Sequence, residues 1–260
     1  MCNLYTKFVK FLEICKKFSN NLVNDNVNIS RRGPVPRFSD LEVVALSMAA
    51  EAEQIRSRIS NHIDGGEDYF CIDSKPMEVC RLARGKRCKM GRNEAFATAP
   101  DFGYCTSQGT YFFGYKLHAL CGLSGVIHSY DISKASVHDI TYLKDIKPLY
   151  HDCSIFGDRA YIGAEIQLDL FETANVKLEC PYRLNQKDWK PAFAPFAKAR
   201  KRNETLFSQL NDQFLTIRNY AKGTCGLFAI IISKVSALTA LQYVNYINGK
   251  PICRIKYAIN

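Results

Sequence analysis

The 260-residue sequence lacks the cysteine patterns that indicate a metal or disulfide scaffold. It has 11 cysteines but no C-x-x-C pair, the spacing typical of zinc and redox motifs. The count is odd, and no apolar secretory segment precedes the chain, which argues against a secreted disulfide framework. Cys71, Cys121, Cys153 and Cys180 lie in or beside apolar runs, where a thiol behaves as a small hydrophobe. We therefore expect reduced thiols in a cytoplasmic protein.

Internal repeats and low-complexity tracts are also missing, so a repeat architecture or extensive disorder is not expected. The hydrophobic content of 47% is enough for one good-sized core, or for a core with a small extra domain. The most apolar segment, Gly226 to Ile247, is interrupted by Lys234, Gln242 and Asn245. We expect it to form a buried C-terminal helix rather than a membrane span.

Negative charge is scarce relative to positive charge. Lys and Arg number 35 against 25 Asp and Glu, which gives a net charge of +10. This balance favours polyanionic partners, but ribosomal and membrane-surface proteins share it. Charge alone therefore does not separate these classes.

The first 64 residues are predicted to form a small helical region. Apolar positions at helical spacing predict a helix over Leu4 to Val23. A basic loop follows at 31–37, and Ser39 with Glu42 resembles a capping box for a second helix over about 41–55. Two helices joined by a basic loop are compatible with a DNA-binding module and equally with a plain helical hairpin on the main domain.

Residues 65–260 alternate strand and helix patterns, which predicts an α/β sheet with helices on its faces. A capping box at Ser136 and Asp139 is expected to start a helix that ends at Pro148. The expected strands are Tyr69 to Ile72, Tyr111 to Leu120, Val126 to Ile132, Cys153 to Phe156 and Val176 to Cys180. Further helices are expected over Ala164 to Thr173 and from Glu204 to Ile217.

Three carboxylates occupy positions suited to holding divalent cations. Asp73 and Asp158 each follow a short apolar run that is predicted to be a strand. Glu204 lies in a basic helix about one turn before Phe207 of its apolar stripe, so its side chain is expected to lean toward the buried side. Hard cations such as Mg²⁺ and Mn²⁺ prefer carboxylate oxygens, and two such ions can catalyse phosphoryl transfer. Taken singly, each Asp is more simply a turn or cap residue, and the Glu an ion-pair partner on its helix.

The sequence around these acids resembles the catalytic domain of bacterial DDE transposases, with the IS982 family of insertion sequences as the closest match. The resemblance extends in order from Asp68 to the C-terminus, and it is weaker over Arg31 to Val44. Its motifs are Ile72–Pro76, Val79–Arg81, Asp101–Cys105, Tyr115–His118, Ser133–Asp139, Gly157–Tyr161 and Arg202–Leu210.

The resemblance implies an RNase H-like fold, that is, a mixed sheet flanked by helices. It also implies an enzyme that cuts and joins DNA at the inverted-repeat ends of its mobile element, with Mg²⁺ or Mn²⁺ held by Asp73, Asp158 and Glu204. The implied partners are these ends, target DNA and a second copy of the chain, with no membrane, in the bacterial cytoplasm at the nucleoid. The residues expected near the site or on DNA phosphates are Lys75, Arg81, Lys116, His118, Arg159, Tyr161, Arg200, Lys201 and Arg202. For His118 and Tyr161, packing inside the protein and contact with DNA are equally compatible with the sequence.

Three features depart from the family pattern. Arg159-Ala160 replaces the usual Lys-Gly, and Asn203 replaces an apolar residue before Glu204. The stretch from Ala52 to Asp64 is shorter than in relatives, as in an internally deleted copy. Three alternatives therefore remain: a nuclease or resolvase on the same core, a DNA-binding remnant without catalysis, and a basic ribosome-associated protein.

Overall fold

The computed structural model describes residues 53–91, 98–182, 194–217, 221 and 223–259. The helix predicted over Leu4 to Val23 and the basic loop at 31–37 lie outside the described residues. So does the predicted helix over about 41–55, apart from its last three residues. The two alternatives for this region, a DNA-binding module and a plain helical hairpin, therefore both stay predictions.

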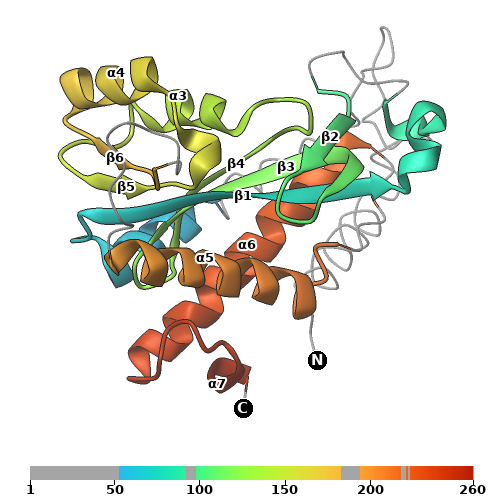
Figure 1. Ribbon diagram of the computed structural model, residues 1–260. Coiled ribbons are helices and arrows are strands. Elements are labelled where there is room, and N and C mark those ends of the chain that lie inside the picture. The colour runs from blue at the N-terminus through green and yellow to red at the C-terminus, as the bar shows by residue number, and fades with distance from the viewer. Residues whose placement is uncertain (1–52, 92–97, 183–193, 218–220, 222, 260) are drawn as a thin grey trace, which may run out of the picture.

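A six-stranded mixed sheet forms the centre of the molecule (Figure 1). Its strands are β1 (Tyr69–Cys80), β2 (Asp101–Cys105), β3 (Thr110–Gly122), β4 (Ile127–Lys134), β5 (Ser154–Phe156) and β6 (Lys177–Glu179). The order is β2-β3-β1-β5-β6, and β4 also pairs with β3. β3 is antiparallel to β1, β2 and β4, whereas β1, β5 and β6 run parallel. Since β3 lies inside the sheet, nearly all of its residues from Phe112 onward are buried, on both faces.

Helices cover both faces of this sheet. On one face lie α3 (Tyr142–Ile146) and α4 (Ala164–Ala174), and on the other lie α5 (Ala194–Asp212) and α6 (Thr224–Ile247), with the short α7 (Lys256–Ile259) beyond (Figure 1). Short 3₁₀ helices η1 (Leu82–Arg87), η2 (Lys89–Gly91), η3 (Asp139–Thr141) and η4 (Arg159–Tyr161) fill the connections. The predicted α/β class, a mixed sheet flanked by helices, is confirmed.

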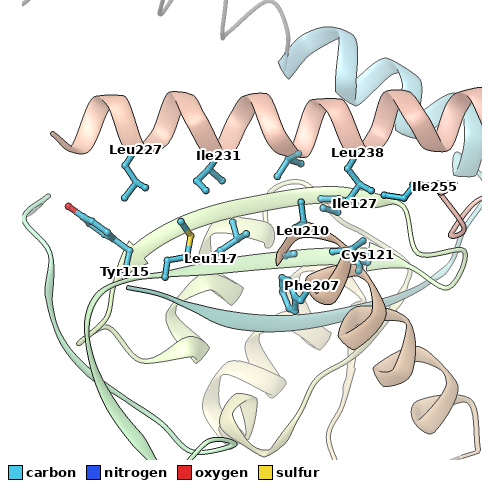
Figure 2. Packing of buried hydrophobic residues seen from close by; sticks show 14 of the residues in the cluster. Tyr115, Leu117, Cys121, Ile127, Phe207, Leu210, Leu227, Ile231, Leu238 and Ile255 are labelled. Carbon is cyan, nitrogen blue, oxygen red and sulfur yellow. The ribbon is translucent and has the colours of Figure 1, made fainter. Parts of the chain in front are cut away.

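The larger core lies between the sheet and the α5–α6 pair, as Figure 2 shows. Leu227, Ile231 and Leu238 descend from α6 onto Leu117 of β3 and its neighbours. By length and composition alone, Gly226–Ile247 is apolar enough to cross a membrane, with a mean hydropathy of 1.7. The core helix of a globular protein can be equally long and apolar. Leu227, Ile231 and Leu238 form a buried stripe of α6 that packs on the sheet, as a buried helix requires.

β1 is longer than predicted, because the strand does not stop at Ser74-Lys75-Pro76. It continues to Cys80, and Pro76 lies opposite Lys116 of β3. The pairing of β1 with β5 ends at Cys71, so Pro76 lies in a part of β1 that has a paired strand on one side only. A proline without a backbone N–H is tolerated in such a position. Asp73 therefore lies within a strand, at the level where its neighbour β5 ends.

The predicted capping box at Ser136 is wrong. The segment begins with η3, whose N-cap is His138, and the His138 ring accepts a hydrogen bond from the backbone N–H of Ile140. α3 follows and ends at Ile146. Asp139 is the first residue of η3, and its carboxylate is bound elsewhere. The predicted helix over Glu204 to Ile217 also ends earlier, at Asp212.

Residues 53–64 form a helix that is fastened to β4. The buried guanidinium of Arg56 donates to the carbonyl oxygens of Ile127 at 2.6 Å and His128 at 3.0 Å. Near the end of the helix, Asp64 accepts a hydrogen bond from Ser124 at 2.6 Å. This segment thus packs on the β3–β4 hairpin.

Candidate active site

Asp73 and Asp158 meet in one pocket at the end of the β1–β5 pairing. Cys71 of β1 lies beside Phe156 of β5, and each aspartate follows two residues later on its own chain segment. Adjacent parallel strands thus carry two carboxylates to the same edge of the sheet. The pocket is lined by Cys71, Ile72, Asp73, Gly157, Asp158 and Arg200.

Backbone N–H groups hold both carboxylates in place. Asp73 Oδ1 accepts from the N–H of Ser74 at 2.8 Å. Asp158 is the N-cap of η4, and its Oδ1 accepts from the N–H of Ala160 at 2.8 Å. The cap explains Asp158 without function, as expected for an aspartate after a strand. Asp73 lies within a strand and has no such structural reason.

The electrostatic environment of the pocket disfavours two bare carboxylates. Burial raises the pKa of Asp73 to about 7, with an added effect from the charge of Asp158, against the Ser74 N–H and Arg200, which lower it. Burial also raises the pKa of Asp158, and the charge of Asp139 adds to that rise. Carboxylates with raised pKa values in a shared pocket are typical of functional sites. A positive partner would stabilise both.

Gly157 permits this close approach of the two segments. A Cβ at this position would lie 3.1 Å from Cβ of Tyr161 and 3.2 Å from Cγ2 of Ile72. Tyr161 is itself fully buried, and its hydroxyl has no hydrogen-bond partner among the described residues. The charges of Asp139, Asp73 and Asp158 act on this hydroxyl, whose pKa is raised mainly by burial. Tyr161 therefore lies near the site, where the resemblance placed it.

Glu204 does not line this pocket, and the prediction that it leans toward the buried side is wrong. Its side chain is 59% exposed and accepts from Nε of Arg200 at 3.1 Å. Asn203 is the buried residue instead, and its Nδ2 donates to the carbonyl oxygen of Cys71 at 3.2 Å. The buried stripe of α5 also contains Leu206, Phe207 and Leu210. This stripe runs through Asn203, so Glu204, the next residue, lies outside it.

Arg200 is the residue of α5 that does reach the pocket. Its positive charge lowers the pKa of both Asp73 and Asp158, and its guanidinium also holds Glu204. Arg200 thus connects the two-aspartate pocket to the third predicted acid. The exposed face of α5 next to Glu204 forms a separate shallow pocket that includes Lys201, Thr205 and Ser208.

A further carboxylate, that of Asp139, lies close enough to the pocket for its charge to act on Asp73 and Asp158. It accepts from Oγ of Ser74 at 2.9 Å and from Nζ of Lys116 at 2.7 Å, and Lys116 also donates to the carbonyl oxygen of Val137 at 2.8 Å. Ser74 and Lys116 are diagonal neighbours on β1 and β3. The sequence prediction missed this role because it depends on strand register, and Asp139 had been explained as a cap.

The other predicted cations are distributed around the molecule. Lys116 is bound to Asp139, and Lys75 donates to Oγ1 of Thr216 at 3.0 Å, with a pKa lowered to about 8 by burial. Burial raises the pKa of the Cys253 thiol, and the charge of Arg202 acts against this rise. Arg159, directly after Asp158, is exposed, as are Arg81 and Lys201. Arg200 is the predicted cation that lines the pocket among the described residues, and the DNA contacts of all these cations stay predictions.

His118 of β3 is buried inside the protein. Its Nε2 is 2.7 Å from Oγ of Ser133, and its ring stacks on Tyr142 with centroids 5.2 Å apart. Burial lowers the pKa of His118 to about 4, so its ring is neutral. Of the two alternatives for this residue, packing and DNA contact, the contacts favour packing.

Two of the three carboxylates fit a divalent cation. Asp73 and Asp158 offer hard oxygen ligands from adjacent strands, and their raised pKa values indicate that a cation would relieve unfavourable charge. Among the described residues, however, no group of three or more His, Cys, Asp or Glu side chains is arranged to hold a metal ion. Glu204 is engaged with Arg200 instead.

Comparisons with known proteins give a family. No curated protein matches the chain in sequence. Two solved structures overlap it: a Mos1 transposase paired-end complex with the left transposon end, at 10% identity and a TM-score of 0.26, and a pre-cleavage Mos1 transpososome, at 12% and 0.24. Each overlap covers 89% of this chain and 70% of the other, and neither is close enough to compare sites. The family model described as "Transposase DDE domain" matches residues 64–240, well over half of the chain, so the protein belongs to this family.

Proposed function

We propose that this protein is a DNA transposase of the IS982 type, which cuts and joins the ends of an insertion sequence at the Asp73–Asp158 pocket. One observation carries the proposal: in a chain of the transposase DDE family, two buried aspartates from adjacent parallel strands share a pocket that raises both pKa values. Asp158 also caps η4, but Asp73 has no such structural role, and a neutral side chain would cost less to bury at its position.

The reaction needs a cation at these aspartates, and the family generally uses divalent metal ions. Asp73 and Asp158 would hold Mg²⁺ or Mn²⁺, which when bound supplies an activated oxygen nucleophile and stabilises the leaving oxygen. The Ser74 and Ala160 N–H groups keep the carboxylate oxygens oriented toward the pocket. Glu204 is proposed as the third acid of this site, on the family resemblance and on its link through Arg200.

The proposed substrates are the inverted-repeat ends of the element and target DNA. The net charge of +10 and exposed cations such as Arg81, Arg159 and Lys201 support a polyanionic partner. Their simpler interpretation is a solvated basic surface. Because two ends must be joined, we propose that two copies of the chain act together, in the bacterial cytoplasm at the nucleoid.

The exposed ion pair of Glu204 favours one alternative, a DNA-binding remnant with impaired catalysis. In this alternative, Glu204 no longer contributes to the metal site. The short segment before β1, which suggests an internally deleted copy, supports the same alternative. The remnant binds the same DNA but leaves it intact. A nuclease on the same fold would cut DNA without joining it.

The test is an assay of cutting and joining on DNA that flanks the coding sequence. Duplex oligonucleotides from both flanks are incubated with the full chain and Mg²⁺ or Mn²⁺, and nicked and joined products are separated on a denaturing gel. We expect metal-dependent cleavage and joined product with the unmodified protein, and neither with Asp158→Asn or Glu204→Gln.

The variants separate the candidates. Binding without cleavage by the unmodified protein would establish the remnant and contradict the transposase, and cleavage without joined product would indicate the nuclease. Cleavage that survives Glu204→Gln would remove Glu204 from the site. Asp169→Asn is the matched control. Asp169 lies on α4 in an exposed ion pair with Lys147, so this variant should cut DNA as the unmodified protein does.

A further inference from the structure

A row of aromatic side chains lies along one face of the β2–β3 hairpin, away from the Asp73–Asp158 pocket. Phe102 is opposite Phe113, and Tyr104 is opposite Tyr111. The ring centroids are 4.8 Å apart in each pair. Because the pairs are two residues apart along both strands, all four rings share one face. Phe102 and Phe113 form the inner pair of the row and are partly covered. Tyr104 and Tyr111 form its outer pair and are 48% and 67% exposed.

The basic 3₁₀ helix η1 is fixed directly beside this row. Gly85 packs on the aromatic rings so closely that a Cβ would lie 2.7 Å from Cζ of Phe102 and 2.9 Å from Cδ2 of Phe113. The same 3₁₀ helix also contacts β3, the strand that pairs with β2. Only glycine allows this approach, so the position of η1 against Phe102 is set by packing.

Five exposed cations stand on this helix and its flanks: Arg81, Arg84, Lys86, Arg87 and Lys89. None of the salt bridges among the described residues involves any of them. Asp101, the acid at the start of β2, lies 3.9 Å from Lys134. Five unneutralised cations within nine positions repel each other, and a polyanion would relieve this repulsion.

We propose that the outer Tyr104–Tyr111 pair and the basic η1 segment, residues 81–89, together bind an unpaired DNA strand. The tyrosine rings offer exposed faces on which bases stack, and the cations contact the phosphates that follow along the strand. A duplex would satisfy the cations but not the rings, because its bases are already stacked on each other. The inference rests on the proposed function, in which cuts at offset positions on the two strands of an element end leave an unpaired overhang.

Fluorescence anisotropy with labelled oligonucleotides tests this surface. The full chain is titrated with a mixed-sequence single-stranded 20-mer and with the matching duplex, in EDTA so that no cleavage occurs. The double variant Tyr104→Ala/Tyr111→Ala is expected to bind the single strand at least about tenfold more weakly, and the duplex with less than about a twofold change. Both tyrosines are exposed, so the variant should fold, which circular dichroism checks.

Matched variants assign the two contributions. Tyr104→Phe/Tyr111→Phe keeps the ring faces and should keep single-strand binding, and Tyr257→Ala, a tyrosine on α7 that is 41% exposed, should change nothing. Lys86→Ala/Arg87→Ala should weaken both DNA forms and lower the salt slope of single-strand binding by about 0.7 for each phosphate that is no longer neutralised.

Two results would overturn the proposal. One is an equal loss of single-strand and duplex binding, or no loss, in the Tyr→Ala variant. The other is unchanged DNA binding with altered self-association in sedimentation, which would make the aromatic row a protein contact. Since the measurement excludes divalent metal, a protein that fails to cut DNA can still bind the single strand here, and the failure of either idea is seen separately.

Discussion

At the scale of single residues, the candidate site depends on a carboxylate in an unfavourable place. Asp73 lies within β1, buried, facing Asp158 across the end of the β1–β5 pairing. Its pKa of about 7 means that the folded chain holds this proton over a pH range in which the unfolded chain releases it. Stability is therefore lost as the pH rises from about 4 to about 7, and the loss is complete above that range.

The first prediction follows from this cost. Asp73→Asn keeps the shape and the hydrogen bond from Ser74 but removes the charge, so the variant should be more stable than the unmodified protein above pH 7, by up to about 4 kcal/mol. Below pH 4 the two should be equally stable. Urea denaturation at pH 4, 5.5, 7 and 8 measures the difference, with the exposed Asp169→Asn as control. A constant difference across these pH values would show that Asp73 is not the buried titrating group.

The residue scale also shows what the sequence could and could not predict. Asp73 and Asp158 were recognisable because each follows an apolar run, and parallel strands bring such positions together. The phase of α5 was misjudged because Glu204 was placed three residues before Phe207. Leu206 and Leu210 were the available signal, since they place Asn203 at the centre of the stripe. Because Asn203 is polar, it was not expected to be buried, and the buried face of α5 was therefore not recognised from the sequence.

At the scale of elements, Asp139 joins three segments that the sequence keeps far apart. Its carboxylate holds Ser74 of β1 and Lys116 of β3, and thereby fixes the start of η3 against the strand that carries Asp73. No sequence pattern shows this, because it requires the register of β1 on β3. β1 passes through Pro76 because its pairing with β5 already ends at Cys71, so no strand on that side needs a backbone N–H from Pro76.

The second prediction concerns this network. The side chains of Lys116 and Asp139 are only 14% and 16% exposed, so removing one partner leaves a nearly buried charge uncompensated. Lys116→Met should destabilise the fold by roughly 3 kcal/mol, and Lys116→Met/Asp139→Asn should be less destabilised than the sum of the two single variants. Chemical denaturation of the four proteins measures this. Strictly additive effects would contradict a direct interaction.

The third prediction concerns the helix at 53–64. Its buried Arg56 donates to the carbonyl oxygens of Ile127 and His128 of β4, and no apolar side chain could replace these bonds. Arg56→Ala should cost roughly 2–4 kcal/mol of stability and should increase hydrogen exchange in residues 53–64. The neighbouring exposed Arg58→Ala is the control, with an expected change of less than about 0.5 kcal/mol. Equal effects of the two variants would show that this helix is not held through Arg56.

At the scale of the whole molecule, the mixed sheet, the helices on its two faces and the position of two acids at one sheet edge agree with membership of the transposase DDE family. The alternation of strand and helix patterns was enough to predict this architecture. Expectation and structure differ at Glu204, which pairs with Arg200 and does not line the pocket of the two aspartates.

The most direct test of the account is the binding of Mn²⁺ to the full chain, followed by electron paramagnetic resonance and by thermal unfolding at pH 8. Mn²⁺ should bind the unmodified protein and raise its unfolding temperature, and at a hundredfold excess over Kd it should add about 2.7 kcal/mol of stability. Asp73→Asn and Asp158→Asn should each lose the bound signal and the added stability, whereas Asp169→Asn should keep both. Equal Mn²⁺ binding by all four proteins, or by none, would contradict a cation site at Asp73 and Asp158.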